Sequence, residues 1–396
     1  MTNEKEYPEG LRKGLTPNVL KLGFVSFVAD IASEMLYPIM PIFLSVTLGA
    51  PATAIGFIEG LAELIASLLK VFSGRWSDRT RKRKIWIING YLASSLGKFA
   101  IAFAGSWLWV LFCRSLDRVG KGLRTAPRDA LLSDSVRPQY QGKAFGWHRG
   151  MDTMGAALGP LVALFVISKN IDLRQLFFYS VIPAGFTVLA AFAVREIPGS
   201  KSVETPRFEI SQMPNKFWKF LLVVVVFSLT NSSDAFLILR FQGQEQSFNS
   251  LIFTYCGFNL VYAAASPWIG SLSDRIGFRR CYFFGYFLFA LTYGIFASTD
   301  QKPFLAAGFL IYGIYMAMTE GISKALAISL VPNHLKGTAI GLLGLSLGIS
   351  SLISSTLAGI LWDHVAPSSV FYLGSAGALL SAALFSFLLR SERRSQ

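Results

Sequence analysis

The chain consists of long apolar runs separated by short polar segments, and this pattern restricts its fold more than any other feature. Each run has about 20 residues, the length that an α-helix needs to cross the hydrocarbon core of a bilayer. Inside that core every backbone N–H and C=O group needs a partner within the protein, so only helices and closed barrels span it. Of the 396 residues 53% are hydrophobic and 15% charged, with a mean hydropathy of +0.48. These values exclude an ordinary soluble domain.

Counted at a rise of 1.5 Å per residue, the apolar runs predict an all-α membrane protein with twelve transmembrane helices. The predicted spans are 18–46, 53–73, 85–105, 107–125, 142–168, 174–194, 216–240, 249–269, 281–298, 304–330, 337–362 and 368–390. A polar stretch after the sixth span divides them into two sets of six. We therefore expect an N-terminal segment 1–17, a six-helix bundle 18–194, a linker 195–215, a second six-helix bundle 216–390 and a tail 391–396.

Lysine and arginine are concentrated at one set of connections between the spans. These connections are residues 75–84 after span two, 275–280 after span eight, and the segment after span four with Arg128, Arg137 and Lys143. On the opposite side, residues 48–52 carry no charge. Short basic loops are retained in the cytoplasm. We therefore expect a multi-pass protein of the cytoplasmic (inner) membrane with the linker and both termini in the cytoplasm.

One basic segment occurs twice. Gly74 to Arg83 returns about 195 positions later as Gly270 to Arg280, each time between two apolar runs. At the same offset, residues 138–146 before span five match residues 332–341 before span eleven. Two matches at one offset indicate a duplicated bundle, as in many secondary transporters, whose substrate site lies between the repeats.

The two segments resemble the loop signature of the major facilitator superfamily, which contains glycine, leucine, aspartate-arginine, a second glycine and two arginines. The second copy matches at almost every position, whereas the first has Trp76 in place of leucine and Arg81 in place of the second glycine. Residues 114–122 resemble the fourth-helix motif of the family. Gly155 to Pro160 resembles its fifth-helix motif, which is associated with antiporters.

This resemblance implies a bacterial-type transporter with two six-helix bundles around a central cavity, lined mainly by helices one, four, seven and ten. The charge distribution agrees with this arrangement, because an ionisable group at mid-bilayer costs about 2.5–3.5 kcal/mol and normally faces protein or water. The ionisable residues on those four helices are Asp30, Glu34, Asp117, Asp234, Glu320, Arg114, Arg118, Lys121, Arg240 and Lys324.

Two carboxylates on helix one are the leading candidates for proton coupling. Asp30 and Glu34 are four residues apart and share one helix face near mid-membrane, where each influences the protonation of the other. Asp234 and Glu320 are further candidates. The alternative is that the carboxylates of helix one are permanently paired with arginines of helix four and serve assembly. Pro38 follows on helix one and is expected to kink it.

Further polar residues are candidates to line the cavity. Arg118 on helix four and Asp152 on helix five each lie about 15 Å deep by residue count, so we expect an ion-pair network between them. The substrate-cavity candidates are Asp30, Glu34, Arg114, Asp117, Arg118, Lys121, His148, Arg149, Asp152, Asn231, Asp234, Arg240 and Lys324.

The repeated segments and the helix-five glycines are candidates for a conformational gate. Asp78 and Asp274 each end a helix before an arginine, where a carboxylate can hold a neighbouring helix in one state and release it in another. Gly155 and Gly159 permit close helix contact. The gate candidates are Gly74, Asp78, Arg79, Gly270, Asp274, Arg275, Gly155, Gly159 and Pro160.

Other functions are disfavoured. The net charge of +14 comes from scattered segments and not from one patch, which argues against nucleic-acid binding. The three cysteines have no metal-ligand spacing, so no metal or cofactor is expected. No hydrolase or phosphate-loop motif occurs, so we do not expect an enzyme. The aromatic residues, 14% of the chain, are expected mostly to face lipid or the membrane interface.

We therefore expect a monomeric, proton-coupled secondary transporter that moves a small organic solute by alternating access. The surplus of arginine on helices four and five favours a solute with carboxylates or another anionic group, such as a siderophore or other metal chelator. A proton-driven antiporter for drugs or toxic metabolites is the alternative, supported by Gly155 to Pro160. A membrane receptor or regulator that does not transport is the second alternative.

Overall fold

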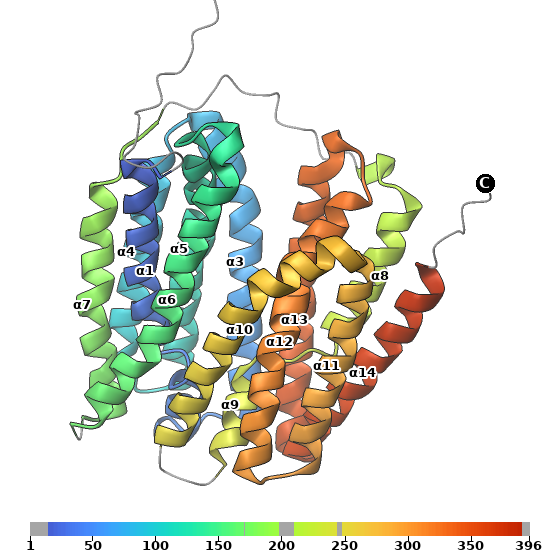
Figure 1. The fold of residues 1–396 in the computed structure, drawn as a ribbon. Helices are drawn as coiled ribbons and strands as arrows, with labels where there is room; N and C mark the ends of the chain where they lie inside the picture. Colours follow the sequence, from blue (N-terminus) through green and yellow to red (C-terminus); the bar gives the residue numbers. More distant parts are fainter. Residues whose placement is uncertain (1–14, 170, 198–209, 244–247, 390–396) are drawn as a thin grey trace, which may run out of the picture. The chain divides into compact units, whose positions relative to one another are not determined.

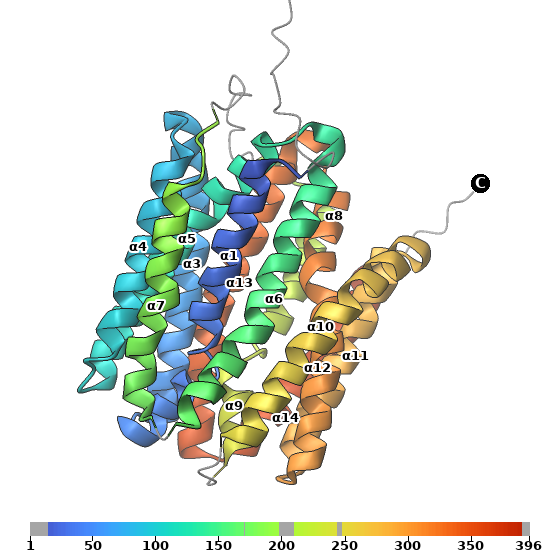
Figure 2. The same ribbon diagram turned by 60° about the vertical axis from the view of Figure 1, so that its left-hand side comes forward.

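The fold is known from a computed structural model that describes residues 15–169, 171–197, 210–243 and 248–389 (Figures 1 and 2). Within these ranges the chain is helical and has no β-strand. The helices are α1 (Pro17–Glu34), α2 (Met40–Ile42), α3 (Ala52–Thr80), α4 (Arg83–Ile101), α5 (Trp107–Asp134), α6 (Gln141–Ile167), α7 (Leu173–Phe192), α8 (Asn215–Ser228), α9 (Ala235–Gln242), α10 (Asn249–Ile276), α11 (Phe278–Ser298), α12 (Lys302–Ser329), α13 (Lys336–His364) and α14 (Pro367–Leu388).

The helices follow the predicted spans, two of which are broken. The first span contains α1 and α2 with a turn at Pro38, as expected from the proline, and the seventh contains α8 and α9. By length and composition, α6, α7, α11, α12, α13 and α14 are each apolar enough to cross a membrane. The all-α membrane fold is thus confirmed, while the total of twelve spans stays a prediction.

Three helices continue well beyond the predicted ends of their spans. The predicted ends at residues 73, 125 and 269 are wrong, because α3 runs to Thr80, α5 to Asp134 and α10 to Ile276. Hydropathy marks only the lipid-embedded part of a helix, whereas residues such as arginine, lysine and leucine continue the helix into polar surroundings. Arg128 therefore lies inside α5 and not in a loop after it.

The two copies of the repeated segment both end in a residue with a positive φ. Gly277, after α10, has φ of 91°. Arg81, after α3, has a φ of 54°. Among the residues that the structure describes, it is the one non-glycine residue with a positive φ. A side chain in this region costs about 1–2 kcal/mol. The turn is therefore retained in the first copy although its glycine is replaced by arginine.

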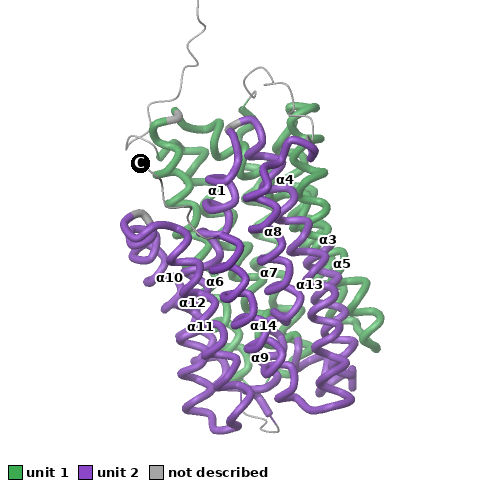
Figure 3. The backbone as a smooth tube through the Cα atoms, turned by 90° about the vertical axis from the view of Figure 1, so that its right-hand side faces the viewer, with its two compact units in different colours: residues 1–40, 65–205 green, residues 41–64, 206–396 purple. Residues whose placement is uncertain are grey.

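The chain forms two compact units, shown in different colours in Figure 3. Unit 1 comprises residues 1–40 and 65–205, and unit 2 comprises residues 41–64 and 206–396. In unit 1, α4 packs on α5 and α7, and α1 packs on α6 and α7. In unit 2, α12 packs on α10 and α11, and α14 packs on α11 and α8. The predicted limits of the two bundles stay a prediction, but residues 41–64 pack with the second half of the sequence.

Glycines bring α4 and α5 into backbone contact within unit 1. A Cβ atom on Gly90 would lie 2.6 Å from Cβ of Arg124 and 2.7 Å from the carbonyl oxygen of Gly120. Such distances leave no room for a side chain at Gly90. This close approach places Arg124 directly against α4.

Aromatic side chains form the core of unit 2. Phe289 stacks on Tyr293 with ring centroids 4.0 Å apart, and it also contacts Phe227 and Tyr315 at 4.8 and 5.0 Å. Tyr286 and Tyr293 are among the largest fully buried side chains of the protein. The expectation that aromatic residues mostly face lipid is wrong for this core.

A cap and a row of glycines join the first part of α3 to α13 within unit 2. The carboxylate of Asp363 accepts hydrogen bonds from the backbone N–H groups of Ala52 (3.0 Å) and Thr53 (2.8 Å) and from the Thr53 hydroxyl (2.7 Å). A Cβ atom on Gly56 or on Gly359 would collide with the backbone of the facing helix. These contacts explain why residues 41–64 belong to unit 2.

Candidate functional site

A chain of polar side chains connects α6, α1 and α5 inside unit 1. Asp152 lies 3.4 Å from Nδ1 of His148, and Nε2 of His148 lies 2.9 Å from the hydroxyl of Ser26. The same hydroxyl accepts a hydrogen bond of 2.9 Å from Nη1 of Arg128. Arg128 also donates from Nε and Nη2 to Asp129, at 3.1 and 3.0 Å. Three helices thus share one continuous polar contact.

This chain determines which nitrogen of His148 carries the proton. The carboxylate of Asp152 faces Nδ1 and accepts hydrogen bonds, whereas the Ser26 hydroxyl beside Nε2 can either donate or accept. Nε2 is then the acceptor of a neutral imidazole and Nδ1 carries the hydrogen, which faces Asp152. The arrangement orients the imidazole and links it to a carboxylate on the same helix.

Asp30 and Glu34 lie beside this chain, where α6 closely approaches α1. A Cβ atom on Gly155 would lie 2.9 Å from Cβ of Asp30, and one on Gly159 would lie 2.9 Å from Cβ of Glu34. The two glycines have the same i,i+4 spacing as the two carboxylates. The absent side chains therefore let α6 pass directly over the acidic face of α1.

The charged neighbours of Asp30 come from three helices. The negative charges of Asp152 and Glu34 repel the Asp30 carboxylate, and the positive charges of Arg128 and Lys121 attract it. Asp30 is half-buried, and it forms no ion pair with any residue that the structure describes. The permanent pairing with an arginine of helix four, considered above as an alternative, is therefore not present for Asp30.

A second ionic network lies between α4 and α5 and is fully buried. Asp117 is 2.8 Å from Nζ of Lys98, 3.4 Å from Nη1 of Arg114 and 3.2 Å from Nε of Arg118. The hydroxyl of Ser94 donates to the same carboxylate. The expected pairing of Arg118 with Asp152 is wrong, because α5 turns Arg118 towards Asp117 on its own helix and Asp152 pairs with His148. Three of the cavity candidates, Arg114, Asp117 and Arg118, are thus buried.

The charged face of α5 is longer than the sequence analysis indicated. Residues 114, 117, 121, 124 and 128 follow one another at spacings of three and four, so they lie along one face of the helix. Arg128 was placed in a loop because the span was ended at residue 125, and Arg124, which lies inside the predicted span, was not recognised as part of the charged face. The regular spacing of charged residues beyond the apolar run was the signal that could have found them.

Unit 2 has its own polar centre where the helix is interrupted between α8 and α9. Asp234 accepts a hydrogen bond of 2.7 Å from the hydroxyl of Tyr312, and Ser354 donates to the carbonyl oxygen of Asn231 at 2.8 Å. Ser355 accepts from the backbone N–H of Ser233 at 3.1 Å. Two hydroxyl groups of α13 thus satisfy backbone groups that the interrupted helix leaves unpaired, while the hydroxyl of Tyr312 on α12 holds the Asp234 carboxylate.

The remaining candidates of unit 2 lie apart from this break. The carboxylate of Glu320 accepts a hydrogen bond from the hydroxyl of Tyr262, and Lys324 is exposed. Arg240 pairs with Asp300 at 2.6 Å and donates to the carbonyl oxygen of Phe296 at 3.0 Å. Through these contacts Arg240 anchors the end of α11.

Comparison with known proteins identifies the family. The sequence profile described as Major Facilitator Superfamily matches residues 22–255 and 242–396. The chain belongs to the major facilitator superfamily. It is 36% identical over 382 residues to a protein of Methanocaldococcus jannaschii named as an MFS-type transporter, covering 94% of this chain and 95% of that protein.

More distant members of the superfamily are also similar. The multi-drug resistance efflux pump PmrA of Streptococcus pneumoniae is 24% identical over 347 residues, which cover 79% of this chain and 85% of that protein. The solved structure of the nucleoside transporter NupG matches the fold with a TM-score of 0.78 at 13% identity, covering 95% of this chain and all of NupG (100%). The chain therefore has the fold of a superfamily transporter.

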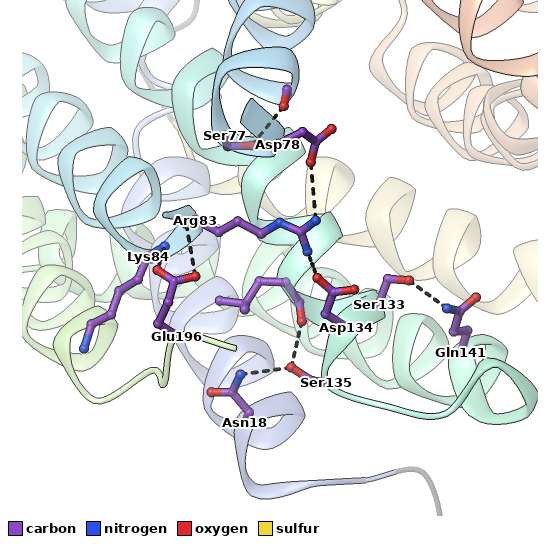
Figure 4. Close-up of polar contacts among 12 residues, drawn as sticks. Asn18, Ser77, Asp78, Arg83, Lys84, Ser133, Asp134, Ser135, Gln141 and Glu196 are labelled. Carbon is purple, nitrogen blue, oxygen red and sulfur yellow. Dashed lines mark hydrogen bonds and ion pairs between the residues drawn. The ribbon is translucent and has the colours of Figure 1, made fainter. Parts of the chain in front are cut away.

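The superfamily signature segment of unit 1 is part of a polar cluster at helix ends (Figure 4). Arg83, the first residue of α4, donates to Asp78 at 3.3 Å and also pairs with Asp134 at the end of α5. Glu196 accepts hydrogen bonds from the backbone N–H groups of Arg83 and Lys84 at 3.0 and 2.7 Å. The cluster ties the ends of α3, α4 and α5 to the chain that follows α7.

The other gate candidates have fewer described contacts. Gly74 faces α5, since a Cβ atom there would lie 3.2 Å from Cβ of Ala126, whereas Arg79 and Arg275 are exposed. Gly270 lies in α10 with open space around it. The side chain of Asp274 is outside the described part of the structure. Arg149 is exposed on α6, and Pro160 lies within this helix without ending it.

Proposed function

We propose that the protein is a proton-coupled secondary transporter of a small organic solute with a carboxylate or another anionic group, a class that includes siderophores and other metal chelators. The observation that carries the proposal is the cluster of Asp30, Lys121, Arg128 and Asp152 in unit 1, whose members come from α1, α5 and α6. It combines cations that can bind an anion with carboxylates that can exchange a proton.

Access and charge support this assignment. Asp30, Arg128 and Asp152 are half-buried and Lys121 is exposed, so the cluster is not sealed inside unit 1. Along the charged face of α5, residues 114, 117, 121, 124 and 128 comprise four basic residues and one acidic residue. The net positive charge of this face, which is carried partly by buried residues, attracts anions to the cluster.

Asp30 and Glu34 are the proposed proton-binding groups, with Asp234 and Glu320 as further ones. Asp30 has no ion-pair partner among the described residues, so a change in its charge does not first require the breaking of a salt bridge. His148 and Asp152 extend from the cluster to Ser26 and Arg128. In this proposal, protonation of the cluster and binding of the anion alternate during the transport cycle.

Efflux of drugs or toxic metabolites is the second candidate function. Two observations favour it: the similarity to PmrA, and the contact of Gly155 and Gly159 with the acidic face of α1. A membrane receptor or regulator that does not transport is the third candidate function.

The basic connections between the helices also support a proposed membrane orientation, with both termini in the cytoplasm and the protein in the cytoplasmic membrane. We also propose that the protein is a monomer and has no enzymatic activity.

The test is transport by purified protein in proteoliposomes with an imposed pH gradient. We expect uptake of a radiolabelled citrate or hydroxamate chelator that depends on the gradient and is abolished by an uncoupler. Gradient-driven transport of cationic dyes, with no transport of the anions, would instead establish the efflux function. Counterflow of any solute would reject the receptor role.

A further inference from the structure

The buried charges of the protein are strongly unbalanced. Among the described residues, Lys98, Arg114, Arg118 and Arg124 are 6 to 9% exposed, whereas Asp117, at 3%, is the one buried carboxylate. Three of the four cations contact Asp117. Arg124 has no carboxylate within ion-pair distance in the described part of the chain.

An unpaired guanidinium in such surroundings is costly. Arginine stays protonated at any physiological pH, so Arg124 cannot avoid the cost by losing its charge. The ring of Tyr91 offsets part of it, because the guanidinium carbon lies 4.6 Å above the ring centroid. The ring carries no net charge, so a negative charge is still needed to balance the guanidinium of Arg124.

Two hydrogen-bond donors at this place are unused. Nη1 of Arg124 and the hydroxyl of Tyr91 are both buried and have no hydrogen-bond partner in the structure. Buried donors without a partner commonly indicate a bound water molecule or ion. Arg124 is on α5 and Tyr91 on α4, at the place where Gly90 lets the two helices touch. The donors therefore come from two rigid elements in backbone contact.

We propose that Arg124 and Tyr91 bind a small monovalent anion, a halide such as chloride or a single carboxylate group, between α4 and α5. A water molecule would satisfy the two donors but would leave the positive charge unbalanced. The site adjoins the half-buried cluster of Asp30, Lys121, Arg128 and Asp152, since Asp30 and Arg128 act electrostatically on Arg124, but neither of its two donors belongs to that cluster. The inference does not depend on the proposed function, because it follows from the burial and contacts of this site alone.

The experiment measures thermal unfolding of the full-length purified protein in chloride, acetate or sulfate salts of equal ionic strength. Sulfate is the reference because it is doubly charged and strongly hydrated. We expect a saturable rise of the unfolding temperature of about 2–4 °C in chloride or acetate. A response to chloride alone indicates a resident halide, a response to acetate alone indicates a carboxylate, and either supports the site.

Variants separate this site from other anion effects. Arg124→Met should remove the anion response and should be no less stable than the wild type in sulfate, because it removes an unpaired charge. Tyr91→Phe keeps the charge and should weaken the apparent anion affinity about ten-fold or more. Arg280→Gln, which changes an exposed arginine of α11, should respond like the wild type.

Two results would overturn the proposal. One is equal unfolding temperatures of the wild type in all three salts, which would mean that the site holds water only. The other is a wild-type anion response that persists unchanged in Tyr91→Phe and in Arg124→Met. If Arg124→Met does not fold, Tyr91→Phe and binding of radiolabelled chloride decide the question alone.

Discussion

Replacement of Asp117 by asparagine should destabilise the protein more than any other single change of a charged side chain. The substitution keeps the shape of the side chain but removes the carboxylate that Lys98, Arg114 and Arg118 contact at 2.8, 3.4 and 3.2 Å. Breaking a buried ion pair by removing one partner costs about 3–5 kcal/mol. The carboxylate is 4% exposed, so solvent does not screen this loss.

The measurement is the unfolding temperature of the purified protein. A loss of about 3–5 kcal/mol corresponds to a fall of about 6–20 °C for a unit of this size. Lys98→Met should cost less, because two cations still neutralise Asp117. In the double variant the loss of Lys98 should partly restore the stability of Asp117→Asn, since one unpaired cation is removed. Strictly additive effects, or a fall below about 2 °C for Asp117→Asn, would refute this reasoning.

Three further predictions concern transport and the contacts of α3. Asp30→Asn and Glu34→Gln should each abolish the pH dependence of transport in proteoliposomes, because an amide cannot release a proton; an unchanged pH profile in both excludes them from coupling. Asp363→Ala should lower the free energy of unfolding by about 0.5–2 kcal/mol through loss of the α3 cap, and Thr53→Val, which keeps both backbone hydrogen bonds, should cost less in the same thermal assay. Gly359→Ala should cost about 1–3 kcal/mol, because its methyl group meets the backbone of α3; an unfolding temperature equal to that of the wild type would contradict the close contact.

The sequence predicts the helical membrane fold well, because lipid imposes a simple rule on apolar runs of sufficient length. It predicts the break after α1, since a proline lies there. The break between α8 and α9 was missed although Asn231 to Asp234 form a run of residues whose side chains compete with helical hydrogen bonds. This run lies inside an apolar span, so hydropathy alone conceals it.

The candidate site was only partly predictable, because helix spacing gives the face of a residue and not its partner. The spacing of Asp30 and Glu34 on α1 was evident, but their contact with the glycines of α6 depends on how the two helices pack. Lys98 is the one charged residue of the predicted span 85–105 in the sequence, whereas its pairing with Asp117 depends on the register between α4 and α5. The sequence also fails to predict the backbone at Arg81. A residue with a side chain disfavours a positive φ, so the surrounding helices and not the residue itself impose this turn.

The cap on α3 has a consequence for biosynthesis. Asp363 follows Thr53 by 310 residues, so the first turn of α3 emerges from the ribosome long before its capping carboxylate is made. During that interval the backbone N–H groups of Ala52 and Thr53 and the bare glycine surface of the helix have to be covered by lipid headgroups, water or the insertion machinery. Completion of translation, and not insertion of the early helices, is then the event that fixes this end of the helix in its native place.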